Sequence, residues 1–247
     1  MKKFILILLL ILFLFPCIVN ADKFHGKIVK KKGDVFIKNA DGTERSPEES
    51  DYIAISDEEI STLKNGRAVV KFTNGSVTVI GENSTLGIEK PTMFSHIRGK
   101  ILFAFAKISG PSRMVRTNSA VFGVRATSFI VQKDKNGELL ALKEGLVNVE
   151  SQSGAFEIHK QIEADEFSNF KSEMETGVND IKKEGEEYMQ QVKDEYIAYK
   201  RSFLLQPDNV IRINGNRVDE SKIDDALKSD FNDFENFAGD ILKGYRD

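Results

Sequence analysis

Short stretches of alternating apolar and polar residues recur between residue 24 and about residue 149, and most of them start at a glycine. The clearest are residues 33–37, 66–72, 75–80, 99–105 and 145–149. Alternation with a period of two, bounded by Gly, Asn, Asp and Ser, predicts half-buried β-strands. Because glycine readily adopts positive φ angles, we expect these glycines to form the corners between strands. No helical period separates the strands, which favours a β-sandwich, β-roll or solenoid over an α/β sheet.

Two segments in this region predict other local structures. Residues 73–76, Thr-Asn-Gly-Ser, are typical of a two-residue hairpin turn, since Asn-Gly readily takes positive φ. Residues 46–60 are acidic and do not alternate. They predict a solvated loop, or a helix that starts at Ser56 with Glu59 three residues on as its capping partner. Their carboxylates lack the Asp-x-Asp-x-Asp-Gly spacing of a calcium-binding loop.

The pattern changes to a helical period beyond residue 170. From 171 to 203, apolar residues recur every three, four or seven positions and predict an amphipathic helix that is stopped by Pro207. Its apolar positions are Val178, Ile181, Tyr188, Val192, Tyr196, Tyr199 and Phe203. Residues 210–218 then predict a small hairpin about Asn214-Gly215.

A second amphipathic helix is predicted from about Ser221 onward. Its apolar face comprises Ile223, Leu227, Phe231, Phe234, Ile241, Leu242 and Tyr245. We expect both helical stripes to pack on the β-structure or on each other; alternatively, one of them docks a partner protein or a membrane surface. Neither helix is strongly basic, which argues against the membrane.

The beginning of the chain has the order of a secretory signal peptide. Two lysines precede an apolar run from Phe4 to Val19, and small residues follow it. This order predicts cleavage after Ala21 and a periplasmic or secreted protein with no stable membrane insertion. The run is slightly shorter than the ~20 residues that span a bilayer. Two alternatives stay open: retention as an anchor, or a lipid on Cys17, although Phe and Pro precede it where lipoprotein signals carry small residues.

Composition narrows the function classes. Cleavage would remove Cys17, the only cysteine, and leave no thiol for a disulfide, a zinc site or a nucleophile. The net charge is −3 and the charges are mixed in sign, so no patch for nucleic acid is predicted. The absence of tryptophan leaves Phe as the main source of aromatic packing.

Candidate catalytic chemistry is sparse. The three histidines, His25, His96 and His159, do not have the spacing of zinc ligands. Two Ser-x-x-Lys tetrads, at 61–64 and 168–171, lack the Ser-Asp-Asn and Lys-Thr-Gly partners of penicillin-interacting enzymes. A carboxylate pair for sugar hydrolysis needs only to meet in space, and the sequence singles none out. We therefore predict no catalytic, cofactor-binding or metal-binding residues and no enzymatic activity.

One segment is more specific than the alternation. Residues 115–131 read Val-Arg-Thr-Asn-Ser-Ala-Val-Phe-Gly-Val-Arg-Ala-Thr-Ser-Phe-Ile-Val, and residues 142–149 read Leu-Lys-Glu-Gly-Leu-Val-Asn-Val. This sequence resembles the FecR domain family, which carries the pattern T-x-x-A-x-x-G-V-R-G-T-x-F-x-V followed by G-x-V-x-V. The matching positions are Thr117, Ala120, Gly123, Val124, Arg125, Thr127, Phe129, Val131, Gly145, Val147 and Val149. Ala126 departs from the pattern, because the family usually has a second glycine there.

Further blocks at 26–37, 63–76 and 162–166 are similar to the family, so the resemblance covers roughly residues 24–170. It implies a mainly β fold, a β-roll or solenoid-like stack of short strands, here with a C-terminal α-helical extension. The expected organisation is a signal peptide at 1–21, a FecR-like β-domain at 22–170, and a helical C-terminal region with a short hairpin at 171–247. The expected structural motif comprises Thr117, Gly123, Arg125, Thr127, Phe129 and Gly145.

Three motif residues carry specific expectations. Gly123 interrupts a strand where a bend or close backbone approach is expected, so a β-branched residue there would strain the chain. Phe129 is expected to share one inner face with Val131. Arg125 is predicted to form a cross-strand ion pair or to donate to turn carbonyls; alternatively, its planar guanidinium binds a carboxylate or sugar acid.

The resemblance also implies a function. FecR domains are usually non-enzymatic envelope modules, and in the iron-dicitrate regulators an additional N-terminal cytoplasmic segment engages a sigma factor. Only Met1 to Lys3 precede the apolar run here, so direct regulation of a sigma factor is not expected. The expected function is binding of a partner protein or polymer in the periplasm or cell envelope, in signalling or assembly. The alternative is an envelope enzyme acting on glycans.

Overall fold

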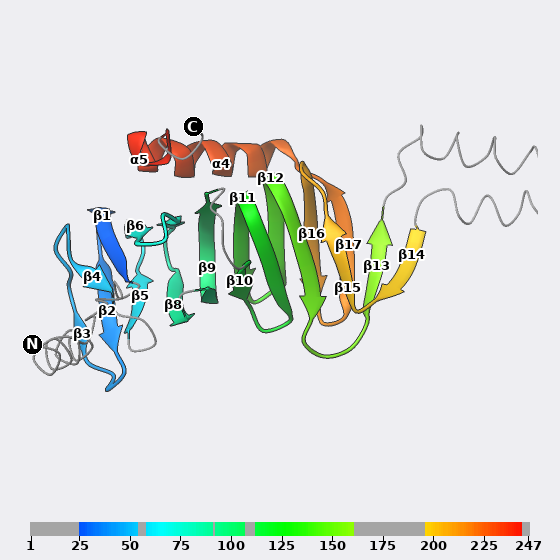
Figure 1. The fold of residues 1–247 in the computed structure, drawn as a ribbon, viewed down its shortest axis with the longest axis horizontal. Coiled ribbons are helices and arrows are strands. Elements are labelled where there is room, and N and C mark those ends of the chain that lie inside the picture. Colours follow the sequence, from blue (N-terminus) through cyan, green and yellow to red (C-terminus); the bar gives the residue numbers. More distant parts are fainter. Residues whose placement is uncertain (1–24, 54–57, 91, 107–111, 161–195, 244–247) are drawn as a thin grey trace, which may run out of the picture.

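The computed structural model describes residues 25–53, 58–90, 92–106, 112–160 and 196–243 (Figure 1). This part of the chain is mainly β, as the sequence predicts. The strands are β1 (Gly26–Lys32), β2 (Val35–Asn39), β3 (Glu44–Arg45), β4 (Tyr52–Ile53), β5 (Glu58–Thr62), β6 (Arg67–Phe72), β7 (Val77–Ile80), β8 (Thr85–Lys90), β9 (Met93–Phe105), β10 (Arg113–Arg116), β11 (Ala120–Asp134), β12 (Gly137–Ser151), β13 (Phe156–Lys160), β14 (Tyr196–Lys200), β15 (Ser202–Leu205), β16 (Asn209–Asn214) and β17 (Arg217–Lys222). The helices are α4 (Asp225–Ala238) and α5 (Asp240–Lys243).

The strands form two layers that share three long strands. One layer, which we call the open sheet, has the order β2, β5, β8, β9, β10, β11, β12, β15. The other, the covered sheet, has the order β1, β6, β7, β9, β11, β12, β16, β17, β13, β14. The strands β9, β11 and β12 run through both layers, so the stack is a flattened roll.

The three shared strands turn from one sheet to the other at residues with positive φ. These corners are Gly99 (φ 86°), Ala126 (φ 52°) and Gly145 (φ 90°). The prediction that glycines form corners is confirmed at the two glycines. A Cβ on Gly145 would lie 2.3 Å from the carbonyl oxygen of Ala126, so two of the corners also touch.

At each corner, the alternation of inward- and outward-facing residues along the strand shifts by one position. In β11 the inward residues are Phe122 and Val124 before the corner, and Phe129 and Val131 after it. The spacing of five between Val124 and Phe129 requires one extra residue, which the β-bulge at Ala126 supplies. As a result, both halves of β11 bury their apolar face in the same core.

Phenylalanines fill the space between the sheets. Phe94 from the open sheet lies 6.1 Å from Phe103 of the covered sheet and 5.0 Å from Phe72, measured between ring centroids. Phe129 stacks on Phe103 at 5.3 Å and is fully buried. Val131 lies in the same core, so the shared inner face expected for Phe129 and Val131 is confirmed.

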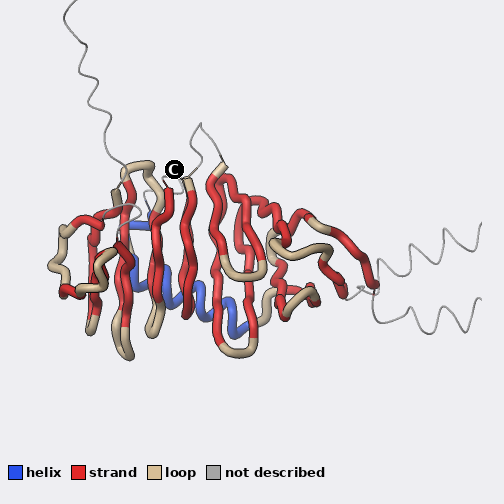
Figure 2. Tube along the Cα trace, turned by 90° about the horizontal axis from the view of Figure 1, so that it is seen from below, coloured by secondary structure: helices blue, strands red, loops and turns tan. Residues whose placement is uncertain are grey.

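Helix α4 closes the outer surface of the covered sheet, and Figure 2 shows it crossing the strands on one side of the layers. Its side chains Leu227, Phe231 and Phe234 pack on a second apolar cluster that includes Val79, Leu102, Ile130 and Ala141. The helix begins at the N-cap Asp224, whose carboxylate accepts from the Leu227 amide at 2.9 Å, and ends at Gly239. The predicted second helix therefore packs on the β-structure; Tyr245 lies outside the described residues.

Ion pairs fix the helix along its length. Lys100 on β9 contacts Asp230 at 2.6 Å, and Lys143 on β12 contacts Glu235 at 2.6 Å. Arg67 on β6 pairs with Asp233 at 2.9 Å, and its guanidinium lies 4.4 Å from the centroid of the Phe237 ring. The acidic side of the helix thus matches cationic residues on three strands.

The prediction of a helix over 171–203 is wrong for residues 196–203. Residues 196–205 form the strands β14 and β15, and residues 171–195 lie outside the described part. The apolar positions Tyr199 and Phe203 fit a helical spacing, but pairing with β13 and β12 decides the structure instead. The hairpin predicted over 210–218 is confirmed as β16 and β17.

Residues on both sides of the boundary expected at residue 170 share one core. Leu205, Ile211 and Val218 belong to the same buried cluster as Phe129. The C-terminal strands therefore complete the two sheets rather than forming a separate layer.

Two turn predictions change in detail. The hairpin at 73–76 is confirmed, but its loop has three residues, because Phe72 and Ser76 still pair, and Gly75 alone has positive φ. The prediction of a helix that starts at Ser56 is wrong where it includes Glu59, because Glu59 lies in a strand. Glu58–Thr62 forms β5, which pairs with β2 and β8, whereas Ser56 lies outside the described part.

Candidate binding surface

The outer surface of the open sheet is the candidate site. No described helix covers it, in contrast to the covered sheet (Figure 1). Strand register sets two rows of side chains on this surface, because directly paired residues point to the same side of a sheet. The first row is Lys38, Glu59, Gly87, Ser95, Arg116, Val121 and Glu150. The second row is Met93, Met114, Gly123, Asn148 and Leu204.

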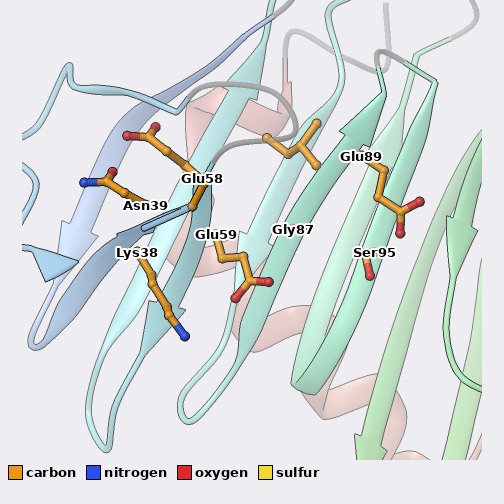
Figure 3. Close-up of a pocket in the computed structure, with 9 residues that line it drawn as sticks. Lys38, Asn39, Glu58, Glu59, Gly87, Glu89 and Ser95 are labelled. Atoms are coloured by element: carbon orange, nitrogen blue, oxygen red, sulfur yellow. The ribbon is translucent and has the colours of Figure 1, made fainter. Parts of the chain in front are cut away.

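A polar groove of about 460 Å³ lies at the β2 end of the first row (Figure 3). Gly87 has no side chain and pairs with Glu59 on one side and Ser95 on the other, so the row is interrupted there. The lining residues are Lys38, Asn39, Ala40, Glu58, Glu59, Gly87, Ile88, Glu89 and Ser95. Most of the residues that line the groove are therefore charged or polar.

Arginines engage two of the three carboxylates in the groove. Arg45 contacts Glu58 at 3.2 Å, and the Arg116 Nε donates to Glu89 at 3.1 Å. The hydrogen bond to Glu89, reinforced by its charge, raises the pKa of Arg116 above its ordinary value. Both carboxylates are thus held by arginines of this chain.

An apolar patch lies at the β15 end of the second row. Leu146 is 49% exposed and Leu204 is 59% exposed. Leu204 pairs with Asn148, so Leu146 is its diagonal neighbour on the same face. Beside them, Gly123 contributes no side chain and Met114 is half-buried. The two exposed leucines therefore form a small apolar patch on this face.

Thr117 acts in a buried turn between β10 and β11. Its hydroxyl donates to Glu138, a carboxylate that is only 5% exposed. The same carboxylate accepts from the amides of Asn118 at 3.0 Å and Ser119 at 3.3 Å. Since an unpaired buried carboxylate would be costly, Thr117 has a structural role in this arrangement.

Gly123 differs from expectation. Its φ is not positive, and a Cβ built on it would meet only Asn148, at 3.8 Å, which is an ordinary contact. The close backbone approach predicted there is therefore wrong, and the strain predicted for a β-branched residue loses its basis. Gly123 instead lies on the outer surface, beside Asn148 and the apolar patch.

Arg125 is exposed on the same surface, opposite Leu146. Its side chain makes no hydrogen bond or ion pair that would fix it within the described ranges, so the internal partner expected for it is not observed there. Thr127 and Gly145 meet at the corner, where a Gly145 Cβ would lie 2.6 Å from the Thr127 Cγ2. The six motif residues thus divide: Gly123 and Arg125 face outward, and the other four support the fold.

The described residues offer no metal centre, since they contain no group of three or more His, Cys, Asp or Glu side chains placed to hold an ion. His159 is buried and contacts Glu157 at 2.7 Å. His96 pairs with Leu86 in β9, and its side chain lies outside the described part. Among the described helices, none is long and apolar enough to cross a membrane.

Sequence reasoning missed the apolar patch, although one signal was present. Val147 and Val149 occupy the inward phase of β12, which places Leu146 on the outward phase among polar residues. An apolar residue out of phase marks a surface patch. Leu204 gave no such signal, because its segment was assigned to the end of a helix.

Comparison with known families supports the resemblance seen in the sequence. Residues 58–148 match the family model described as FecR protein. This segment is a FecR domain. It starts with β5 and ends within β12, so it contains the corners at Gly99, Ala126 and Gly145.

Two crystal structures of a candidate anti-sigma factor from Parabacteroides distasonis are similar to this chain. The structure at 1.65 Å resolution is 14% identical, with a TM-score of 0.46, covering 70% of this chain and 63% of its own. The structure at 2.50 Å is also 14% identical, with a TM-score of 0.44, covering 69% and 62%. The chain therefore spans less than two thirds of these proteins. No curated protein matches it.

Proposed function

We propose that this chain is a non-enzymatic, exported cell-envelope protein whose open sheet binds a partner protein or envelope polymer, in envelope signalling or assembly. The FecR domain supplies the class of module. The single observation that carries the proposal is the asymmetry of the two outer surfaces. Helix α4 seals one of them, whereas the other keeps Leu146 and Leu204 about half exposed.

The asymmetry has a simple physical meaning. An apolar surface costs free energy in water, roughly 25 cal/mol for each Å². The covered sheet avoids that cost through Phe231 and Phe234, which are each 3% exposed. The open sheet has no equivalent among the described residues, so a partner would supply the missing cover.

The groove at Gly87 would contribute selectivity. Exposed polar groups at the rim of an interface fix its register and exclude wrong partners more than they add affinity. Glu59 and Lys38 flank the groove, at the far end of the same surface from Leu204. A partner lying along the sheet would meet charge at one end and apolar surface at the other.

Affinity capture with matched variants tests the proposal. The exported chain is used as bait in an envelope extract, alongside the double variant Leu146→Asp/Leu204→Asp. Leu63→Asp is the control, because Leu63 is 45% exposed but lies in the turn between β5 and β6. We expect the double variant to lose a partner that the wild type and the control both capture. If the captured set is the same for all three folded proteins, the open sheet is not the binding surface.

A further inference from the structure

The two ends of the sandwich are protected to very different degrees. Edge strands expose unpaired N–H and C=O groups, and proteins commonly protect them by making them short and charged. At one end, β3 is only Glu44–Arg45 and β4 is only Tyr52–Ile53. At the other end, β14 has five residues, Tyr-Ile-Ala-Tyr-Lys, with a single charge. Within the described chain it pairs with β13 alone.

Apolar exposure is concentrated at the unprotected end. The large apolar side chains exposed in the described part are Leu63, Leu146, Ile197, Tyr199 and Leu204. Ile197 and Tyr199 both lie on β14, where they are 46% and 71% exposed. Ala198 between them packs toward the core. Among the described residues, the strand therefore presents an open backbone edge with two apolar side chains on one face.

The sequence of β14 is complementary to itself. In an antiparallel pair of two β14 strands centred on Ala198, Ile197 of each copy lies opposite Tyr199 of the other. Cross-strand pairs of an aromatic and a β-branched residue are stabilising. Lys200 lies opposite Tyr196, so no like charges face each other. A centre at any other residue would pair fewer than the five positions of the strand.

We propose that β14 is a self-association edge, through which two copies of this chain form a symmetric dimer with a sheet continuous across both. The occupant of the edge is thus a second copy of this chain, because the register around Ala198 places Ile197 of each copy opposite Tyr199 of the other. The contact is small, so we expect a weak dimer whose population depends on concentration. This inference does not depend on the open sheet or on its partner.

Charge reversal at the edge tests the pairing. The variant Ile197→Lys/Tyr199→Lys and the variant Ile197→Glu/Tyr199→Glu each place like charges opposite one another in a homodimer. In sedimentation experiments over a concentration series, we expect each to dimerise about tenfold or more weakly than wild type. Mixing the two should restore dimerisation, because opposite charges then face each other. A monomeric wild type, dimers unaffected by the variants, or a mixture that stays monomeric would each overturn the proposal.

Disulfide trapping tests the register. In a Cys17→Ser background, Ala198→Cys places one thiol from each copy at the two-fold axis, with Cα atoms ~4.5–5.5 Å apart, within disulfide range. Lys200→Cys is the control, since its two copies would be more than ~13 Å apart. Covalent dimers of Ala198→Cys but not of Lys200→Cys are expected. Equal trapping of both, or trapping of Lys200→Cys alone, would rule out a pair centred on Ala198.

Discussion

Replacing Ala126 with glycine should stabilise the protein, although it removes a methyl group from a half-buried site. Ala126 adopts φ 52° at the corner of β11, where the pairing register shifts between Arg125 and Ser128. An L-residue with a Cβ pays about 1–2 kcal/mol for a left-handed conformation that glycine adopts freely. The substitution Ala126→Gly removes that cost.

Two effects oppose the gain. Glycine has more freedom in the unfolded chain, which costs about 0.5–1 kcal/mol on folding. The lost methyl removes a small amount of apolar burial. The balance is a stabilisation of up to roughly 1 kcal/mol, which corresponds to a rise in Tm of up to about 4 °C for a chain of this size.

Thermal and denaturant unfolding of purified variants would measure the change. Ala40→Gly is the matched control, because Ala40 is exposed in a turn and is not in the left-handed region. It should be neutral or slightly destabilising. The opposite kind of substitution at the neighbouring corner, Gly145→Ala, should be strongly destabilising. The new Cβ would lie 2.3 Å from the Ala126 carbonyl oxygen. If Ala126→Gly lowers Tm by as much as Ala40→Gly or more, backbone strain at the corner is not a significant energy term.

Four further outcomes follow from the structure. Phe129→Ala should cost about 3–5 kcal/mol in denaturant unfolding, because the ring is fully buried against Phe103; a cost below 1 kcal/mol would contradict its place in the core. Gly123→Val should melt within a few degrees of wild type, since a Cβ at that position meets only Asn148, at 3.8 Å, and should weaken partner capture; a large loss of Tm would instead support a structural role for Gly123. A chain ending at residue 170 should show no cooperative unfolding by circular dichroism, because it lacks the strands and helix that complete both apolar clusters, and a cooperative melt would show that the β-domain is independent. N-terminal sequencing of the exported protein should show cleavage after Ala21, and an intact Met1 or a lipid on Cys17 would refute the predicted signal cleavage.

Alternation of apolar residues was enough to predict most strands, because a strand with one buried face must repeat every two residues. It could not show that β9, β11 and β12 each cross from one sheet to the other. In β11 the buried positions are even-numbered up to Val124 and odd-numbered from Phe129 onward. In the sequence this change appears only as a break in the alternation. The glycines at 99 and 145 predicted corners correctly because positive φ is a local property, whereas the corner at Ala126 depends on its neighbours.

The C-terminal region shows the opposite limit. Tyr196, Tyr199 and Phe203 are spaced by three and four residues, which favours a helix over a single half-buried strand. Long-range pairing with β13 and β12 decides between them, and no local signal contains that information. The same holds for the open surface, since α4 covers the face where Leu227, Phe231 and Phe234 complete an apolar cluster whose other members come from strands far apart in the sequence.

The shared strands have a mechanical consequence. In a sandwich built from separate sheets, the two layers can slide past each other or move apart. Here the backbone of β9, β11 and β12 continues from one layer into the other, so the layers are tied covalently at three adjacent places. A load applied by a partner to the open sheet would be carried along these strands into the covered sheet and its helix. The molecule should therefore respond to pulling or twisting as one stiff block, with its compliance confined to the two ends.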